Sequence, residues 1–227
     1  MTTGNDKSPI VLPGYVPEPR PATADRLIGA HYFPGWKPGK HYGWQVLREF
    51  PERKPILGWY DESNPEVTDW EIKWALEHGI SFFVYCWYRR KENVPVTRDT
   101  LYLEHAIHDG LFQARYRDRF RFAIMWENQK RRSDAQSGVA NEADLMENLL
   151  PFWMEQYFTK PNYLVVDGKP VLFVYRTEVM IEDLGGIDAT RRAVEKMREA
   201  CKRAGFDGLA IMGEHRGTNW QYLEDMK

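Results

Sequence analysis

The stretch Ile80-Ser81-Phe82-Phe83-Val84-Tyr85-Cys86-Trp87-Tyr88 is almost continuously apolar and aromatic, and it follows a helical pattern that stops at Gly79. A strand that is apolar on both faces is typical of a parallel sheet covered by helices. Charged residues follow directly, beginning with Arg89. Because parallel α/β folds bind ligands at the carboxyl ends of their strands, the sequence predicts that this strand carries part of a site.

The composition is that of a globular protein with an unusual number of aromatic rings. The chain has 227 residues, of which 43% are hydrophobic, 28% are charged and 14% are aromatic, including nine tryptophans. Tryptophan often lines ligand clefts, so core filling alone does not explain this number. The formal net charge of -2 argues against a nucleic-acid partner or a membrane-surface partner. Nothing in the sequence indicates the oligomeric state.

The expected environment follows from the cysteines and the termini. Cys86 and Cys201 lie on apolar faces and are expected to be buried free thiols. No apolar run approaches the length of a membrane span. The N-terminus lacks the basic-then-apolar pattern of a secretory signal, so we expect a cytoplasmic protein.

The chain divides into an arm and one larger domain. Residues 1–25 are rich in proline and are expected to form an extended arm, and residues 26–227 form the domain. Strands are predicted at 27–33, 80–88, 120–126, 163–166, 170–175 and 209–212. The two strands at 163–166 and 170–175 flank Asp167-Gly168, which indicates a hairpin. Helices are predicted to begin at a capping box formed by Thr68 and Glu71, between 99 and 116, at Asn141 and near 189.

Strands that alternate with helices build a parallel sheet, which either stays open or closes into a (β/α)8 barrel. An open nucleotide-binding sheet needs a glycine-rich turn after an early strand, and this sequence has none. Aromatic and acidic residues instead follow several successive strands, as in barrel active sites. The sequence therefore predicts an α/β fold of the (β/α)8 TIM-barrel type. About five barrel strands can be counted, so we expect the N-terminal part of a larger barrel.

The strand ends and one long aromatic loop supply the candidate site. Flat aromatic rings stack on the C–H faces of sugars, and carboxylates, amides and arginine bind sugar hydroxyls, while glycoside hydrolysis needs carboxyl groups. The candidate catalytic residues are Glu127 and Glu214. The candidate substrate-binding residues are His31, Tyr32, Trp36, Trp59, Tyr60, Asp61, Trp87, Tyr88, Trp126, Asn128, His215 and Arg216.

Other chemistries have weaker support in this sequence. His105 and His108 are three residues apart on a predicted helix, but no third ligand has a suitable spacing, so no metal site is predicted. No serine or cysteine lies in a nucleophile elbow. The sequence predicts no cofactor and a glycan or polysaccharide as the partner.

Several motifs resemble those of glycoside hydrolase family 99-like proteins, which include the endo-α-mannosidases and the WbsX-type proteins. They are Ile28-Gly29-Ala30-His31-Tyr32-Phe33-Pro34-Gly35-Trp36, Leu57-Gly58-Trp59-Tyr60-Asp61, Asn64-Pro65-Glu66-Val67, the stretch from Gly79 to Tyr88, Phe122-Ala123-Ile124-Met125-Trp126-Glu127-Asn128 and Gly168-Lys169-Pro170-Val171-Leu172-Phe173. The resemblance runs from about Leu27 to the end of the chain.

The resemblance implies a (β/α)8 barrel that acts on α-linked, mannose-type glycans. In the endo-mannosidases the catalytic glutamates lie in an Asn-Glu-Trp-type motif late in the barrel, which no segment of this chain matches. Either the chain ends before the motif or this branch of the family never had it, and the number of missing barrel strands favours the first explanation. Three functions stay open: a glycoside hydrolase, a glycosyltransferase of surface-polysaccharide assembly, and a non-catalytic glycan-binding domain.

Overall fold

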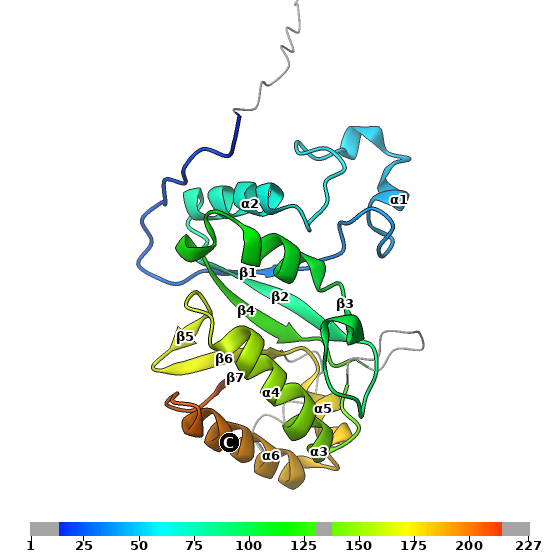
Figure 1. The fold of residues 1–227 in the computed structure, drawn as a ribbon, viewed down its shortest axis with the longest axis vertical. Helices are drawn as coiled ribbons and strands as arrows, with labels where there is room; N and C mark the ends of the chain where they lie inside the picture. The colour runs from blue at the N-terminus through cyan, green and yellow to red at the C-terminus, as the bar shows by residue number, and fades with distance from the viewer. Residues whose placement is uncertain (1–13, 130–137, 215–227) are drawn as a thin grey trace, which may run out of the picture.

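The computed structural model of the chain describes residues 14–129 and 138–214 (Figure 1). Within these residues a seven-stranded sheet forms the centre of the fold. Its parallel strands are β1 (Gly29–Tyr32), β2 (Phe82–Arg89), β4 (Arg121–Trp126), β6 (Lys169–Val174) and β7 (Ala210–Gly213). Two short strands pair antiparallel with them, β3 (Leu101–Tyr102) with β2 and β5 (Val165–Val166) with β6.

The order of the parallel strands distinguishes the two predicted architectures. Neighbouring strands in the sheet are β1, β2, β4, β6 and β7, so their spatial order follows the order of the chain. A doubly wound sheet reverses its strand order at a switch point, whereas a barrel does not. The strand order is that of a barrel, and the sheet is not closed within the described residues. The prediction of an α/β fold of the barrel type, represented by part of its strands, is confirmed.

Helical segments connect the strands. The α-helices are α1 (Gly43–Leu47), α2 (Pro65–Glu77), α3 (Glu142–Asp144), α4 (Leu150–Trp153), α5 (Thr177–Asp183) and α6 (Ile187–Arg203). The π-helical segments are η3 (Ala106–Gly110), η6 (Leu145–Leu149) and η7 (Met154–Phe158). The 3-10 segments are η1 (Pro51–Arg53), η2 (Arg98–Thr100), η4 (Leu111–Gln113) and η5 (Arg117–Arg119). From Glu142 to Phe158, α- and π-helical turns follow one another without a break.

The register of the strands assigns a face to each side chain. Successive residues of a strand point to opposite faces of the sheet. Trp87 pairs with Trp126, and both rings contact Trp153 of α4, at centroid distances of 5.4 and 5.5 Å. This face is the helix-covered face. Cys86 pairs with Met125 in the row before, so these two side chains belong to the opposite face, which would line the interior of a barrel.

The first long helix begins earlier than predicted. Asn64 is the N-cap of α2 and accepts a hydrogen bond from the Glu66 N–H (3.0 Å), and Pro65 occupies the first helical position. Proline is favoured there because its missing N–H is not needed. Thr68 is buried inside the helix, so the capping box that was predicted from Thr68 and Glu71 is wrong.

The predicted cap at Asn141 and the predicted hairpin at Asp167-Gly168 are present, but the predicted helix over 99–116 is not. Asn141 does cap its helix, since its side chain accepts a hydrogen bond from the Asp144 N–H (3.0 Å). The hairpin between β5 and β6 is confirmed, with positive φ values of 49° at Asp167 and 70° at Gly168. Instead of one helix over 99–116, the chain forms short 3-10 and π segments and the strand β3.

Residues 14–25 contain no helix or strand and pack along the outside of α2. The Tyr15 hydroxyl donates to Asp69 of α2, and the Tyr116 hydroxyl donates to the Val16 carbonyl (2.8 Å). Val16 is buried in the core. The described part of the N-terminal segment therefore contributes to the packing of the first β/α unit.

Among residues 14–129 and 138–214, no helix has both the length and the apolar character needed to cross a membrane.

Candidate functional site

Four side chains lie in one row across the carboxyl ends of four neighbouring strands. The last paired residues are Trp87, Trp126, Val174 and Gly213. The next residues along the chain are Tyr88, Glu127, Tyr175 and Glu214, and backbone hydrogen bonds continue the ladder through them: Glu127 N–H to Trp87 (3.0 Å), Tyr175 N–H to Trp126 (3.1 Å) and Glu214 N–H to Val174 (2.8 Å). Because side chains alternate, these four point to the face opposite the helices. We call Tyr88, Glu127, Tyr175 and Glu214 the rim row.

The rim row contains three predicted site residues and one residue that the sequence analysis missed. The structure brings Tyr88, Glu127 and Glu214 together, as expected for strand ends that share one edge. Tyr175 was missed because residues 170–175 were interpreted as half of a hairpin, and the end of that strand was not considered. The signal was present in the sequence, since Phe173-Val174-Tyr175 ends in a polar aromatic residue before Arg176.

Cys86 lies directly beneath the rim row on the same face. Burial, and then the nearby Glu127 carboxylate with which the thiol interacts, raise the pKa of Cys86 well above its usual value, and Glu214 acts in the same direction. The Tyr88 hydroxyl also lies within hydrogen-bonding reach of this sulfur. The thiol therefore stays protonated and serves as a weak donor beneath the carboxylates rather than as a nucleophile.

The segment after β4 is anchored by Asn128. The Asn128 side chain accepts from the Arg176 N–H (2.7 Å) and donates to the Arg176 carbonyl (2.6 Å), so both ends of the amide bind the backbone that follows β6. Asn128 is fully buried. Its predicted role in binding sugar hydroxyls is therefore corrected to a structural one. Next to it, the Gln129 amide donates to Glu127 (3.0 Å).

The connection between β1 and α2 gathers a second group of predicted residues. Trp44 lies at the centre, with ring centroids 4.6 Å from Trp36, 5.3 Å from Trp59 and 4.8 Å from Tyr60. The Trp44 indole N–H donates to the Tyr60 carbonyl (2.6 Å). Trp44 is buried, while Trp36, Trp59 and Tyr60 keep part of their surface exposed. We call these four residues the aromatic cluster. The connection that carries them, which includes α1, leaves the sheet at the end of β1 (Figure 1).

Asp61 stabilises the end of this connection. It accepts hydrogen bonds from the Ser63 N–H (2.8 Å) and hydroxyl (2.5 Å), and Lys37 Nζ lies 3.7 Å away. Burial raises the pKa of Asp61, but the hydrogen bonds from Ser63 and the charge of Lys37 outweigh it and hold the pKa below its usual value. Asp61 is therefore ionised at neutral pH and shapes the turn before α2.

Three predicted binding residues lie on the helix-covered face instead. Trp87 and Trp126 are only 2% and 0% exposed, and the Trp87 indole N–H donates to the Tyr157 hydroxyl (2.9 Å). Tyr32 donates to Glu71 of α2 (2.9 Å). The prediction that these rings stack on a ligand is corrected by the register of the strands. Trp87 and Trp126 each precede a rim-row residue by one position, and Tyr32 pairs with Tyr85, which lies on the same face of β2 as Trp87.

The remaining predicted residues have separate positions. His31 is exposed and lies on the face that carries the rim row, but it pairs with Val84, four residues before Tyr88 on β2. His215 and Arg216 lie outside the described residues.

The two histidines considered as metal ligands have other neighbours. His105 Nε2 lies 3.5 Å from Glu62, and His108 Nε2 lies 3.0 Å from the Tyr157 hydroxyl. Burial lowers the pKa of His108 to about 4. In the described part of the chain, no three His, Cys, Asp or Glu side chains are grouped as a metal ion would require.

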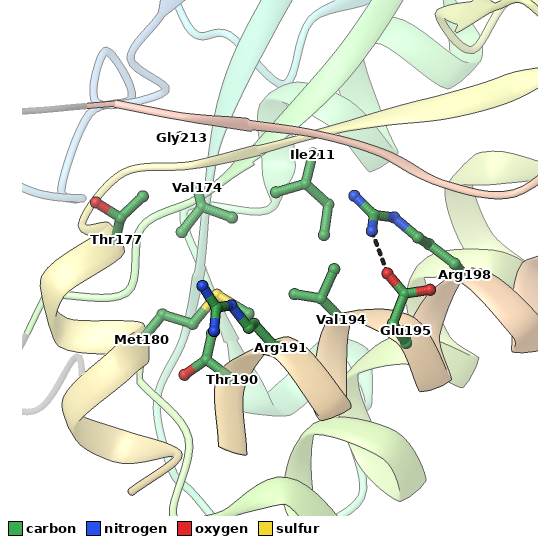
Figure 2. A pocket seen from close by; sticks show the side chains of 10 residues that line it. All are labelled: Val174, Thr177, Met180, Thr190, Arg191, Val194, Glu195, Arg198, Ile211 and Gly213. Atoms are coloured by element: carbon green, nitrogen blue, oxygen red, sulfur yellow. Dashed lines mark hydrogen bonds and ion pairs between the residues drawn. The ribbon is translucent and has the colours of Figure 1, made fainter. Parts of the chain in front are cut away.

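A groove of about 420 Å³ lies beside β7 (Figure 2). Val174 and Gly213 line it and alternate with Tyr175 and Glu214, so the groove is on the opposite face of the sheet from the rim row. It lies between α5, α6 and the edge strand β7. Its lining residues are Val174, Thr177, Met180, Thr190, Arg191, Val194, Glu195, Arg198, Ile211 and Gly213. Barrel enzymes do not place their chemistry in this helical layer, so we assign the site to the rim row and not to this groove.

Comparison with solved structures identifies the same fold in known enzymes. Two structures of the GH99 endo-α-mannosidase from Bacteroides thetaiotaomicron match 90% of this chain, one of them in a complex with bis-tris-propane. The TM-scores are 0.56 and 0.52, with 16% and 13% sequence identity. The matched parts are 57% and 60% of those chains, so this chain spans less than two-thirds of their length. No curated protein matches the chain in sequence.

Comparison with protein families gives a match that covers most of the domain. The profile described as glycosyltransferase WbsX matches residues 49–226. This region includes α2, the strands β2 to β7 and all four residues of the rim row. This region is more than half of the chain. The protein therefore belongs to the WbsX family of carbohydrate-active proteins.

Proposed function

We propose that this protein is a glycoside hydrolase that acts on α-linked, mannose-type glycans, with the rim row as its sugar-binding site. One observation carries the proposal: Glu127 and Glu214 lie in the same row of one sheet face, at the carboxyl ends of β4 and β7. The name of the similar enzymes, endo-α-mannosidases, supports the choice of linkage and sugar.

The spacing of the two carboxylates suits the chemistry. Glu127 and Glu214 are separated by β6, and two strand spacings of about 4.8 Å place their backbones about 10 Å apart. Glycosidases use carboxyl pairs about 5–5.5 Å apart in retaining enzymes and about 6.5–9.5 Å apart in inverting ones. Two glutamate side chains on these backbones can lean toward each other and reach either distance.

The remaining rim residues suit a sugar. The partly exposed Tyr175 ring provides an aromatic face and a hydroxyl group next to the carboxylates, while Tyr88 is 2% exposed and packs against Tyr102. The aromatic cluster lies on the connection that leaves β1. Rings of this kind stack on the C–H faces of hexoses, while the acids bind the hydroxyls. A phosphate ester would instead be expected to meet cations or a helix N-terminus.

The test compares the full-length protein with its Glu127→Gln and Glu214→Gln variants, which keep the shape of each side chain and remove its charge. The release of reducing ends from an α-linked mannan is measured, together with binding of α-linked manno-oligosaccharides by calorimetry. We expect both variants to lose at least about 100-fold in turnover, as is usual when a carboxyl acid or base is removed. Glu195→Gln, an exposed glutamate on α6, is the control and should keep full activity.

A second function is favoured by the description of the family as glycosyltransferases. In that case the rim carboxylates would bind an acceptor sugar, and the protein would consume a nucleotide sugar. Consumption of a nucleotide sugar with no release of reducing ends would select this function and overturn the first. Glycan binding without any turnover would identify a binding domain.

A further inference from the structure

The short strand β3 places another aromatic side chain beside the rim row. β1 pairs with β2 only as far as Tyr85, whereas β3 pairs with the end of β2 and sets Tyr102 opposite Tyr88. Residues directly opposite each other in a pair of strands lie on the same face of the sheet. Tyr102 is partly exposed and packs against the buried Tyr88, with ring centroids 6.2 Å apart. Tyr102 is therefore the accessible ring at this end of the rim row.

Backbone hydrogen bonds place β3 on the edge of β2 that faces away from β4. The Trp87 carbonyl accepts from the Glu127 N–H after β4 (3.0 Å), and the Arg90 N–H donates to the Thr100 carbonyl before β3 (2.8 Å). Residues an odd number of positions apart in a strand turn their backbone groups to opposite edges. Tyr102 and Glu127 are thus two strand spacings of about 4.8 Å apart, or about 10 Å between backbones, which leaves room for a sugar ring between them.

The Arg90 side chain is fixed over the ring of Tyr102. The guanidinium carbon lies 4.8 Å from the centroid of that ring, and Nε donates to the Leu101 carbonyl (2.8 Å). Arg90 is half-buried. A guanidinium that is stacked on a ring and hydrogen-bonded to the backbone loses little freedom when it binds a ligand. Arg90 is therefore positioned before any ligand arrives.

Arg90 differs from its neighbour Arg89 in having no acidic partner. Arg89 is fully buried and paired with Asp144. In the part of the chain that the structure describes, Arg90 forms no ion pair, and its Nη1 and Nη2 groups donate to no other residue. A guanidinium presents parallel N–H groups that match the two oxygens of a carboxylate. Arg90 therefore offers a half-buried cation, next to the proposed sugar site, with its carboxylate-binding groups available.

The backbone directly after Tyr102 is strained. Leu103 is 3% exposed and has a φ of 59°, in the left-handed region that a bulky side chain rarely adopts. Such residues persist only where their surroundings enforce the conformation, and they cluster at ligand-binding sites. The strain at Leu103 ends β3 and fixes the position of Tyr102, so this observation points to the same place as the unpaired guanidinium.

We propose that Arg90, stacked on Tyr102, is a substrate-binding residue that pairs with a carboxylate of the glycan, so the substrate is an acidic polysaccharide that contains a uronic acid. The inference rests on the proposed function, because the acidic unit would lie next to the unit bound at Glu127. A uronic acid carries its charge directly on the sugar ring. A unit that stacks on Tyr102 would therefore bring its carboxylate to the guanidinium, which offsets repulsion from the rim carboxylates.

The experiment uses the full-length protein and two probes: an α-linked manno-oligosaccharide, and the same oligosaccharide with its primary hydroxyls oxidised to carboxylates. Calorimetry at pH 7 measures the affinity for each. Wild type should bind the oxidised probe at least about tenfold more tightly than the neutral one. Arg90→Met should lose this preference and bind the neutral probe as wild type does. Lys91→Met, which removes the neighbouring exposed cation, is the matched control and should keep the full preference.

The affinity ratio also separates this inference from the proposed function. Equal affinity of wild type for the two probes would overturn the inference and leave the proposed function standing, whereas binding of neither probe would overturn both. A preference that persists in Arg90→Met would also overturn the inference. Should Arg90→Met fail to fold, Arg90→Lys decides, because lysine keeps the charge without the paired N–H groups. A reduced ratio in Arg90→Lys supports the inference, and an unchanged ratio overturns it.

Discussion

Arg89 and Asp144 form a fully buried ion pair that joins the carboxyl end of β2 to α3. The Arg89 guanidinium donates to both carboxylate oxygens, from Nη1 to Oδ1 at 3.1 Å and from Nη2 to Oδ2. Nε and Nη2 also donate to the Gly138 carbonyl, at 3.0 and 2.7 Å. Arg89 therefore anchors Gly138 and Asp144, at the start of the segment that contains α3, to the end of β2.

Removing Arg89 is expected to leave an uncompensated buried charge. The Arg89→Met variant should lose about 3–5 kcal/mol of unfolding free energy, measured by urea denaturation, because Asp144 stays buried without its cation. Arg191→Met is the control, since Arg191 and Asp188 form an exposed pair at 3.3 Å. Exposed pairs contribute about 0–1 kcal/mol. Equal losses in the two variants would contradict the role given to the buried pair.

The same pair predicts a loss of stability in acid. Burial raises the pKa of Asp144, but hydrogen bonds from Arg89, the Ala140 N–H and Asn148 outweigh burial. Together they lower the pKa from 3.8 to about 2. Because the folded pKa is lower, this stabilisation is present above pH 3.8 and is lost as pH falls through 2. It amounts to about 2 kcal/mol. Between pH 5 and pH 2, the unfolding free energy of Asp144→Asn should fall by less than that of the wild-type protein. An equal fall in the two proteins would contradict the low pKa of Asp144.

Two tryptophans are expected to separate packing from binding. Trp126→Ala opens a cavity under α4 and should cost about 3–5 kcal/mol of unfolding free energy. Trp59→Ala removes a partly exposed ring of the aromatic cluster, so it should change stability less and weaken manno-oligosaccharide binding, which calorimetry measures. A Trp126→Ala protein that is as stable as wild type and loses only sugar binding would show that the faces of β4 have been assigned wrongly.

Asn128 is expected to act on the site only through the backbone. In Asn128→Ala the Arg176 N–H and carbonyl lose their partners, and an unpaired buried group costs about 1–3 kcal/mol. Thermal unfolding should reveal this loss, whereas Gln113→Ala, an exposed amide on η4, should have almost no effect. An Asn128→Ala protein as stable as wild type, with its sugar affinity abolished, would return Asn128 to the list of direct ligands.

Much of the fold could be predicted because its signals are local. The apolar runs at 80–88 and 120–126 and the turn at Asp167-Gly168 each identify their own structure, and they became β2, β4 and the β5–β6 hairpin. The start of α2 was misplaced because Thr68 and Glu71 match a capping box, while Asn64-Pro65 also forms a valid start. Both local signals predict a helix start, and the helix begins at the earlier one, Asn64-Pro65.

The site was predicted less well because it depends on which face each strand end presents. Trp87 and Tyr88 are neighbours in sequence and lie on opposite faces of the sheet, and an apolar run without alternation does not indicate which of them points outward. Only pairing with β4 and contact with Trp153 resolve this. The polar aromatic end of residues 170–175 indicates a candidate residue, and the pairing of β6 with β4 and β7 places Tyr175 in the rim row.

The central claim is that the rim row binds sugar, and a crystal structure of the full-length protein with an α-linked manno-oligosaccharide tests it most directly. The account predicts a sugar ring in contact with Tyr88, Glu127, Tyr175 and Glu214, on the face of the sheet opposite the helices. A sugar bound only elsewhere, for example in the groove between α5 and α6 beside β7, would contradict it.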